Sequence, residues 1–222
     1  MAEETCPYVS RGGLKLAAAL DAFALDPAGW VCADLGCSTG GFTDCLLQRG
    51  AAHVYAVDTA YGELAWKLRQ DERVTVLERT NALHYDPWQS LGAGFEGCDL
   101  VVVDLGWTVQ ARAVPAALRW LRRMDEPGQM AGAERPGAKG PGVVSLVKPH
   151  YESSGQAMGV AGRGRGRGKR RGVLDIATAE RVLDEVLTAM PAMGVRSAGH
   201  LASPIRGGKG GNLEYLVYLK TI

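Results

Sequence analysis

Apolar runs alternate along this chain with segments whose apolar residues recur at helical spacing. The apolar runs predict strands at 31–35, 54–58, 74–78, 100–104, 143–148 and 213–219. The segments with helical spacing predict helices at 13–23, 43–48, 63–69, 111–124 and 175–190. Strands separated by helices of this length form a parallel sheet covered on both faces. The pattern therefore predicts an α/β fold.

The C-terminal part of the pattern differs from the rest. The run at 213–219 follows a short apolar stretch and the glycine-rich turn at 207–211, which predicts a hairpin and an antiparallel final strand. Two segments fit neither pattern. Residues 125–141 are rich in Gly, Pro and Ala and predict a long loop, and residues 161–172 alternate glycine with arginine.

Length and composition narrow the class of protein. At 222 residues with 46% hydrophobic content, the chain suits one well-cored domain over 1–222. No apolar stretch reaches membrane-spanning length, and the first residues are acidic rather than basic, so we expect neither a membrane span nor a signal segment. The five cysteines lack CxxC spacing, which favours reduced thiols in the cytoplasm and argues against a zinc or other metal site.

A glycine-rich turn follows the first predicted strand. The segment from Asp34 to Asp44 reads Asp-Leu-Gly-Cys-Ser-Thr-Gly-Gly-Phe-Thr-Asp, and it should lead the strand sharply into a helix. The next strand ends on Asp58, at about the twenty-residue spacing of nucleotide-binding βαβ units. A carboxylate there suits the hydroxyls of a ribose. The two features predict a cofactor that contains a nucleoside, with a tight turn without a ligand as the alternative.

The glycine spacing indicates which cofactor. Ser38 stands where a dinucleotide loop has its middle glycine, and no Gly-Lys-Ser/Thr sequence marks a triphosphate loop. S-adenosylmethionine, which carries no phosphate, fits this looser loop better. Asp58 should hold the ribose, and Asn81 and Ala82 should meet the adenine, although Asn81 could instead be only a turn residue. The expected cofactor-binding residues are Asp34, Gly36, Ser38, Thr39, Gly40, Gly41, Phe42, Asp58, Asn81, Ala82 and Asp104.

Four charged residues lie at positions that folding alone would not favour. Asp104 and Lys148 end two apolar strands, at the carboxyl edge where α/β sheets bind ligands. Glu214 interrupts the last apolar strand, and Lys15 lies where the first helix begins. Each alone could be a helix cap or a lysine whose amine reaches water. Together, near a cofactor loop, they are hard to explain by folding alone.

Several motifs give the chain a specific resemblance. Residues 8–15 (Tyr-Val-Ser-Arg-Gly-Gly-Leu-Lys), 34–44, 61–67 and 78–81, with Val-Lys-Pro at 147–149, Ser-Pro-Ile at 203–205 and Gly-Asn-Leu-Glu at 211–214, resemble the TlyA (haemolysin A) family. That family belongs to the FtsJ-like RNA ribose 2′-O-methyltransferases. The resemblance implies a Rossmann-like fold, RNA, in particular ribosomal RNA, as partner, and a catalytic tetrad at Lys15, Asp104, Lys148 and Glu214.

The chain departs from the family pattern at four places. TlyA-like proteins usually carry an N-terminal S4 RNA-binding domain, whereas this chain begins almost at the methyltransferase core. The family's Asp-Val-Ser-Phe is Asp-Leu-Gly-Trp at 104–107, and Lys-Pro-Gln-Phe-Glu is Lys-Pro-His-Tyr-Glu at 148–152. The Arg-Gly segment is an insert. It could be a solvated surface loop, but such segments also bind RNA phosphates, so we expect RNA contacts from Arg163, Arg165, Arg167, Lys169, Arg170 and Arg171. We also expect an RNA contact from Arg11, near the N-terminus.

Three functions remain open from the sequence. The first is RNA ribose 2′-O-methylation, in which Lys148 meets the 2′-hydroxyl as a base or as a steering donor. A lysine is a base only when neutral; a nearby Lys15 would favour that form, and Asp104 and Glu214 would oppose it. The second is methylation of an acceptor other than RNA. The third is an RNA-binding protein of the same fold without turnover.

Overall fold

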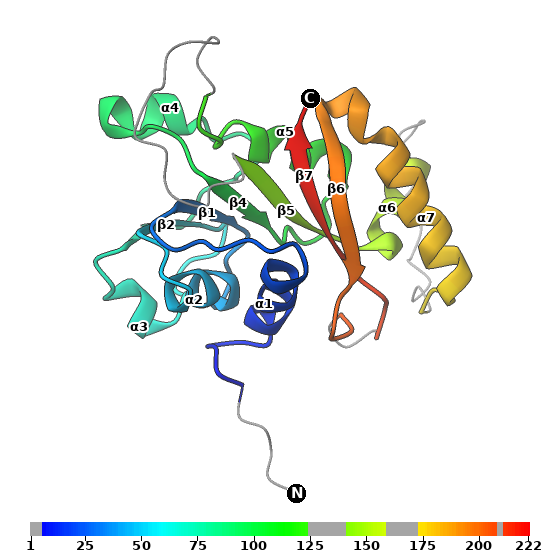
Figure 1. Ribbon diagram of the computed structural model, residues 1–222, viewed down its shortest axis with the longest axis horizontal. Helices are drawn as coiled ribbons and strands as arrows, with labels where there is room; N and C mark the ends of the chain where they lie inside the picture. The colour runs from blue at the N-terminus through cyan, green and yellow to red at the C-terminus, as the bar shows by residue number, and fades with distance from the viewer. Residues whose placement is uncertain (1–5, 124–140, 159–172, 208–210) are drawn as a thin grey trace, which may run out of the picture.

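A computed structural model describes residues 6–123, 141–158, 173–207 and 211–222, and Figure 1 shows its elements in order. The strands are β1 (Val31–Leu35), β2 (His53–Val57), β3 (Val74–Leu77), β4 (Leu100–Val103), β5 (Gly142–Val147), β6 (Val195–Ala202) and β7 (Tyr215–Thr221). The α-helices are α1 (Gly12–Ala22), α2 (Gly41–Gln48), α3 (Trp66–Arg69), α4 (Pro87–Ser90), α5 (Gln110–Leu118), α6 (Pro149–Met158) and α7 (Ile176–Ala189). Two short 3₁₀ helices are η1 (Gly92–Gly94) and η2 (Met190–Met193).

The seven strands form one sheet in the order β3-β2-β1-β4-β5-β7-β6. The first five in that order pair in parallel, and β7 runs antiparallel to both of its neighbours. The predicted parallel sheet with an antiparallel final strand is therefore confirmed. Strand order reverses between β1 and β4, so their carboxyl ends mark the point where open α/β sheets bind ligands.

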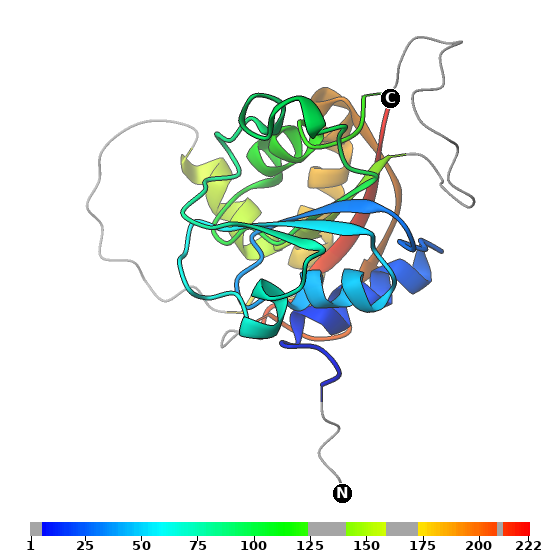
Figure 2. The same ribbon diagram turned by 90° about the vertical axis from the view of Figure 1, so that its left-hand side faces the viewer.

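Two apolar cores cover the two faces of the sheet. Figure 2 shows the helices that lie on either side of it. Residues of α1, α2 and α3 pack on one face, around Leu16, Leu46 and Leu68. Residues of α5 and α7 pack on the other, around Trp120 and Leu183. Strands buried on both faces need continuous apolar sequence, which explains the unbroken Leu-Val-Val-Val of β4.

Three expectations about the helices need correction. The helix expected at 63–69 begins only at Trp66, because Ala65 donates its amide to the carbonyl of Thr39 in the loop after β1. The helix expected at 111–124 ends at Leu118, because the following residues leave helical geometry to pair with Cys98. The third correction is α6, which we did not predict because its sequence is largely polar.

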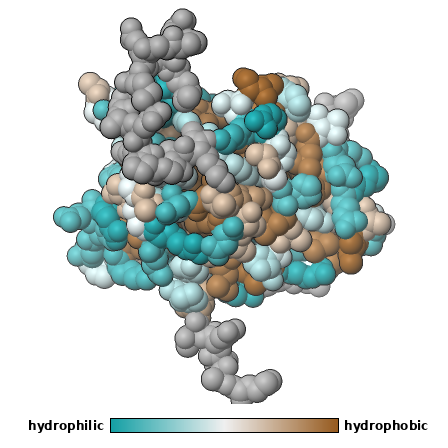
Figure 3. Space-filling view, in the orientation of Figure 1, coloured by the Kyte–Doolittle hydropathy of each residue, from teal (hydrophilic) through white to brown (hydrophobic). Residues whose placement is uncertain are grey.

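The surface facing the viewer in Figure 3 mixes hydrophilic and apolar residues in scattered patches. Among the helices that the structure describes, none combines the length and apolarity needed to cross a bilayer. All five cysteines are free thiols, and four of them are buried.

Candidate functional site

The loop between β1 and α2 takes the sharp turn that its glycines predicted. Gly36 and Gly40 have φ angles of +91° and +98°, and Ser38, which is not a glycine, also lies in the left-handed region at +47°. A Cβ on Gly36 would lie 2.5 Å from the Asp104 carbonyl oxygen, and one on Gly40 would lie 2.3 Å from the Leu68 side chain. These glycines therefore let protein segments pack closely, in addition to shaping a ligand site.

Asp34 is buried at the end of β1 with an incomplete set of hydrogen bonds. Its Oδ2 accepts from the Thr43 amide at 2.9 Å and from the Thr43 hydroxyl at 2.7 Å. Its Oδ1 is buried and has no protein partner. Burial raises the pKa of Asp34 to about 7, the Thr43 hydrogen bonds oppose this rise, and the nearby charge of Asp104 adds to it.

Asp58, at the end of β2, braces the loop after β1. Its Oδ2 accepts from the Ser38 amide at 2.8 Å, and its Oδ1 accepts from the Ala60 amide at 2.8 Å. The hydrogen bond from the Ser38 amide to Asp58 holds Ser38 in its left-handed conformation. Each carboxylate oxygen can accept a further hydrogen bond, so this bracing leaves Asp58 able to bind a ribose.

Two hollows, each of about 300 Å³, lie beside this loop. They share Gly36, Ser38 and Asp104, so together they form one groove across the carboxyl ends of β1, β2 and β4, which we call the cofactor groove. The first hollow is lined by Ser10, Arg11, Gly12, Lys15, Asp34, Gly36, Cys37, Ser38, Thr39, Gly41, Phe42, Asp104, Ile205 and Arg206. The second is lined by Gly36, Ser38, Val57, Asp58, Thr59, Thr80, Asn81, Ala82, Leu83, Asp104, Leu105, Gly106 and Thr108.

The groove brings together nearly all residues that we expected to bind the cofactor. Among them, only Gly40 is not in its lining. Asn81 is a turn residue, whose Oδ1 accepts from the Leu83 amide at 3.0 Å, and it also lines the second hollow, where its predicted contact with adenine stays a prediction. Arg11, which we expected to bind RNA, lines the rim of the first hollow.

The four candidate catalytic residues form two ion pairs. Lys15 on α1 lies 2.5 Å from Glu214, which directly precedes β7, and both side chains are largely buried. Lys148, directly after β5, pairs with Asp104, directly after β4. Segments from four parts of the sequence therefore meet at one edge of the sheet. Gly207 makes room for this arrangement, because a Cβ there would lie 2.0 Å from the Glu214 carboxylate.

The charge state of Lys148 follows from its surroundings. Burial alone would lower its pKa, but the charge and hydrogen bond of Asp104, with the charge of Glu214, raise the pKa of Lys148 above its ordinary value. These charges favour the ammonium form of Lys148, which donates a hydrogen bond to the Asp104 carboxylate. The influence of Glu214 on Lys148 also indicates that the two ion pairs lie close together.

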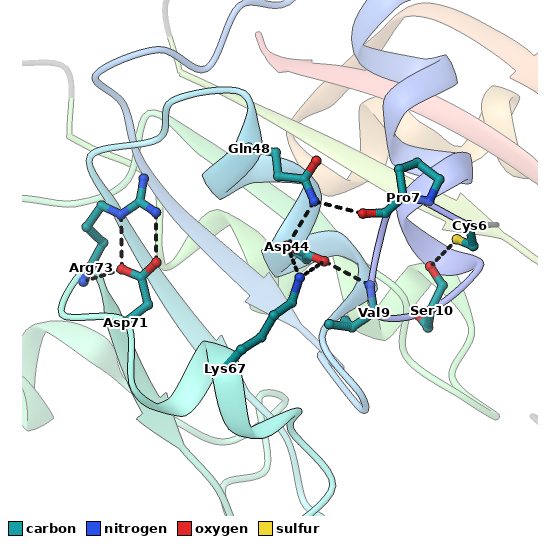
Figure 4. A network of polar contacts seen from close by, with 9 residues as sticks. All are labelled: Cys6, Pro7, Val9, Ser10, Asp44, Gln48, Lys67, Asp71 and Arg73. Atoms are coloured by element: carbon teal, nitrogen blue, oxygen red, sulfur yellow. Dashed lines mark hydrogen bonds and ion pairs between the residues drawn. The ribbon is translucent and has the colours of Figure 1, made fainter.

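A polar network fixes the segment that leads into α1 (Figure 4). Asp44 on α2 is buried, and its carboxylate accepts from the Val9 amide at 2.8 Å and from Lys67 of α3 at 2.9 Å. Gln48 binds both Asp44, at 3.1 Å, and the Pro7 carbonyl, at 3.0 Å. This network anchors the start of α1, the helix that carries Lys15.

The structure adds residues to the site beyond those that the sequence indicated, and it gives Trp107, in the altered segment 104–107, a stacking partner. Ile205 and Arg206 reach the first hollow from the β6–β7 connection, where only the Ser-Pro-Ile motif hinted at a role. Trp107 is 87% exposed, and its ring stacks on Tyr151 with centroids 4.8 Å apart. The Lys148 Nζ lies 5.7 Å from the centre of the Tyr151 ring. Trp107 and Tyr151 are 44 positions apart along the chain, so no local spacing could have predicted their contact.

The residues of the groove fit S-adenosylmethionine. The unpartnered Oδ1 of Asp34 suits an ammonium group such as that of the methionine part, and Asp58 and Asn81 present polar atoms on the second hollow, where an adenosine would lie. Within the described ranges, no cluster of three or more His, Cys, Asp or Glu side chains could hold a metal ion. The basic residues expected at 163–171 lie outside the described residues.

Comparisons with known proteins agree with this geometry. The profile of the FtsJ-like methyltransferase family matches residues 8–221. The 16S/23S rRNA (cytidine-2′-O)-methyltransferase TlyA of Mycobacterium tuberculosis is 41% identical over 96% of this chain, which covers 69% of that protein. Hemolysin A of Brachyspira hyodysenteriae is 31% identical over 95% of the chain and 76% of its own length.

Solved structures show the same fold. A hemolysin-like protein of Streptococcus thermophilus has a TM-score of 0.78 and 34% identity, over 99% of this chain and 69% of that one. Fibrillarin of Aeropyrum pernix, solved with bound S-adenosyl-L-methionine, has a TM-score of 0.54 at 15% identity, over 93% and 74% of the two chains, which is a likeness of fold alone.

The solved structures confirm the predicted Rossmann-like methyltransferase fold. The family match confirms a methyltransferase as the class of enzyme and S-adenosylmethionine as its cofactor. The profile spans almost the whole chain, and the two relatives exceed 30% identity over most of its length. The chain therefore belongs to the FtsJ-like methyltransferase family and, within it, to the TlyA group.

Proposed function

We propose that this protein methylates the 2′-hydroxyl of a ribose in RNA, and that the RNA is ribosomal. The proposal rests on two ion pairs at the edge of the cofactor groove: Lys15 with Glu214, and Lys148 with Asp104. The relative from Mycobacterium tuberculosis is named for this reaction on ribosomal RNA. We also propose that residues 1–222 act as a single methyltransferase domain.

The tetrad suits the demands of this reaction. S-adenosylmethionine supplies a methyl group already activated on a positively charged sulfur. Transfer breaks that carbon–sulfur bond, forms a carbon–oxygen bond and releases the hydroxyl proton, so the protein must align the oxygen and accept a proton. In our proposal, the Lys148 ammonium donates a hydrogen bond that orients the hydroxyl oxygen. The proton passes to the carboxylate of Asp104, which lines both hollows of the groove.

The second ion pair would hold the first in place. Lys15 and Glu214 are both buried, and a buried charge without a partner is costly, so each stabilises the other. In our proposal, the Glu214 charge keeps Lys148 protonated and thereby preserves its role as a donor. The Lys15–Glu214 pair thus contributes to methyl transfer through its electrostatic effect on Lys148.

The aromatic pair beside Lys148 favours RNA over a small acceptor. Trp107 presents its ring to solvent while Tyr151 supports it from behind, and bases stack on such exposed rings with little sequence preference. Trp107 also has a φ of +58°, an uncommon conformation for a bulky residue. We propose that the base of the acceptor nucleotide stacks on Trp107.

Methyl transfer from labelled S-adenosylmethionine to bacterial ribosomal RNA tests the proposal. We expect Lys148→Ala to lower the rate by roughly a hundredfold or more, because the oxygen loses its orienting donor. Cofactor affinity, measured by calorimetry, should change less than about twofold, since Lys148 does not line the groove.

Lys220→Ala is the matched control. Lys220 lies near the end of β7, at the opposite edge of the sheet, and its loss should leave the rate near that of the wild type. Wild-type turnover in Lys148→Ala would exclude Lys148 from the reaction. Cofactor binding without any transfer to RNA by the wild type would instead favour another acceptor or an RNA-binding protein without turnover.

A further inference from the structure

A buried polar network lies behind the Lys148–Asp104 pair, outside the cofactor groove. The Ser145 hydroxyl on β5 donates to Oε1 of Gln110 at 2.7 Å, and the Gln110 Nε2 donates to the Leu146 carbonyl at 3.3 Å. The Gln110 backbone amide donates to Oε1 of Glu152 at 2.8 Å. The side chains of Ser145, Gln110 and Glu152 are all buried, so these hydrogen bonds are shielded from competition by water.

Glu152 joins two segments that each carry part of the site. Gln110 is the first residue of α5, and residues 104–109 before it carry Asp104 and Trp107. Glu152 lies in the first turn of α6, which starts directly after Lys148 and also carries Tyr151. The Glu152 and Tyr151 amides both donate to the Lys148 carbonyl, at 3.3 and 2.8 Å. One carboxylate therefore connects the segment after β4 to the segment after β5.

Burying the Glu152 carboxylate for this connection costs more free energy than a local helix cap would. Val109, the N-cap residue of α5, makes no side-chain cap, whereas a Ser, Thr or Asp there could satisfy the helix amides by itself. Glu152 instead faces an apolar cavity of about 240 Å³ lined by Val109, Ala111, Val186, Ala189 and Met193, with Glu185 also in its wall. Burial raises the pKa of Glu152 to about 7, and the Gln110 hydrogen bond opposes this rise. A local cap would stabilise α5 but would not fix it to α6.

We propose that Glu152 is a positioning residue for methyl transfer, which holds residues 104–109 against the start of α6. The inference rests on the proposed function. In this role, Glu152 keeps two contacts in place: Asp104 with Lys148, and Trp107 with Tyr151. Both contacts join the segment after β4 to the segment after β5, so loosening the link should displace them together.

Three variants test the role of Glu152. Glu152→Ala removes the acceptor, and we expect kcat on ribosomal RNA to fall about tenfold or more, because misplacement of reacting groups by about 1 Å is that costly. Cofactor affinity should stay within about twofold of the wild type, because Glu152 does not line the groove. Glu152→Gln keeps an acceptor oxygen for the Gln110 amide and should restore most of the lost turnover.

Val186→Ala is the matched control, because it removes packing from the same cavity and leaves the polar network intact. We expect it to lower the melting temperature without lowering kcat comparably. If Val186→Ala and Glu152→Ala reduce kcat equally at equal loss of stability, Glu152 is only structural and the inference is overturned. Wild-type kcat in Glu152→Ala would overturn it as well.

Hydrogen exchange gives a readout that does not depend on turnover. Glu152→Ala should speed exchange in peptides covering 104–112, and Glu152→Gln should leave exchange near that of the wild type. If the wild-type protein transfers no methyl group to RNA, the proposed function fails, and the exchange rates still decide whether Glu152 fixes this segment. Unchanged exchange in Glu152→Ala would refute that connection.

Discussion

Two buried carboxyl groups, Asp34 and Glu152, give the protein a pH-dependent stability. In the folded state, burial raises the pKa of each to about 7, from ordinary values of 3.8 and 4.5. Between about pH 4 and pH 7, the folded state therefore holds protons that the unfolded state has released. By linkage, the free energy of unfolding contributed by these groups falls as the pH rises through this window.

Asp34→Asn should weaken this dependence. The asparagine amide does not titrate, and its oxygen can still accept the hydrogen bonds from Thr43. Between about pH 5 and pH 7, we expect the loss of unfolding free energy to be smaller in the variant by roughly 2 kcal/mol. Urea unfolding of the protein without cofactor measures this directly. An equal pH dependence in both proteins would show that Asp34 titrates normally.

At the scale of elements, the start of α1 depends on a single buried carboxylate. Asp44 connects the segment before α1 to α2 and α3, through Val9, Gln48 and Lys67 (Figure 4). Removing this carboxylate leaves the partly buried Val9 amide without its acceptor and breaks the contacts with Gln48 and Lys67. We expect Asp44→Ala to lower the free energy of unfolding by about 1–3 kcal/mol and to reduce turnover by displacing α1, which carries Lys15.

Asp71→Ala is the comparison for this prediction. Asp71 pairs with Arg73 at 2.7 Å in the same region, but both side chains are partly exposed to solvent, so we expect a loss of only about 0–1 kcal/mol. Chemical denaturation of both variants compares the two losses. Equal losses would show that the network around Asp44 contributes no more than an exposed ion pair.

Local sequence determined the strands better than the helices. The run of β1 matches the observed strand residue for residue, because a strand buried on both faces is largely apolar, and Asp34 is its one charged residue. The end of α5 depends on a distant partner: Cys98 binds the Trp120 carbonyl at 2.7 Å and draws the chain out of the helix. Such long-range pairing leaves no local pattern.

The candidate site was predictable to a similar degree. Strand ends revealed Asp58, Asp104 and Lys148, since a charge after an apolar run stands out in sequence. The pairing of Lys15 with Glu214 joins residues 199 positions apart, and it became expected only through the family resemblance. Glu152 stood out only as part of the family segment at 148–152, and its role was not predictable because its partner is a backbone amide on another helix.

At the scale of the whole molecule, RNA binding should extend beyond the groove. Residues 161–172 lie outside the described residues, but their sequence carries six positive charges and no acidic residue. We expect deletion of 162–172 to weaken binding to ribosomal RNA at least tenfold at physiological salt and to flatten its salt dependence, because fewer phosphate contacts are made. Calorimetric affinity for S-adenosylmethionine should be unchanged. Unchanged RNA binding would leave this segment without a role in recognition.

The central claim is that the tetrad directs methyl transfer to a ribose oxygen. The most direct measurement is nucleoside mass spectrometry of bacterial ribosomal RNA after incubation with the protein and labelled S-adenosylmethionine. We predict a labelled nucleoside methylated on its ribose, formed at similar rates by the wild-type protein and Lys220→Ala and at least roughly a hundredfold more slowly by Lys148→Ala. A label on a base, or a ribose label that Lys148→Ala forms at the wild-type rate, would contradict this claim.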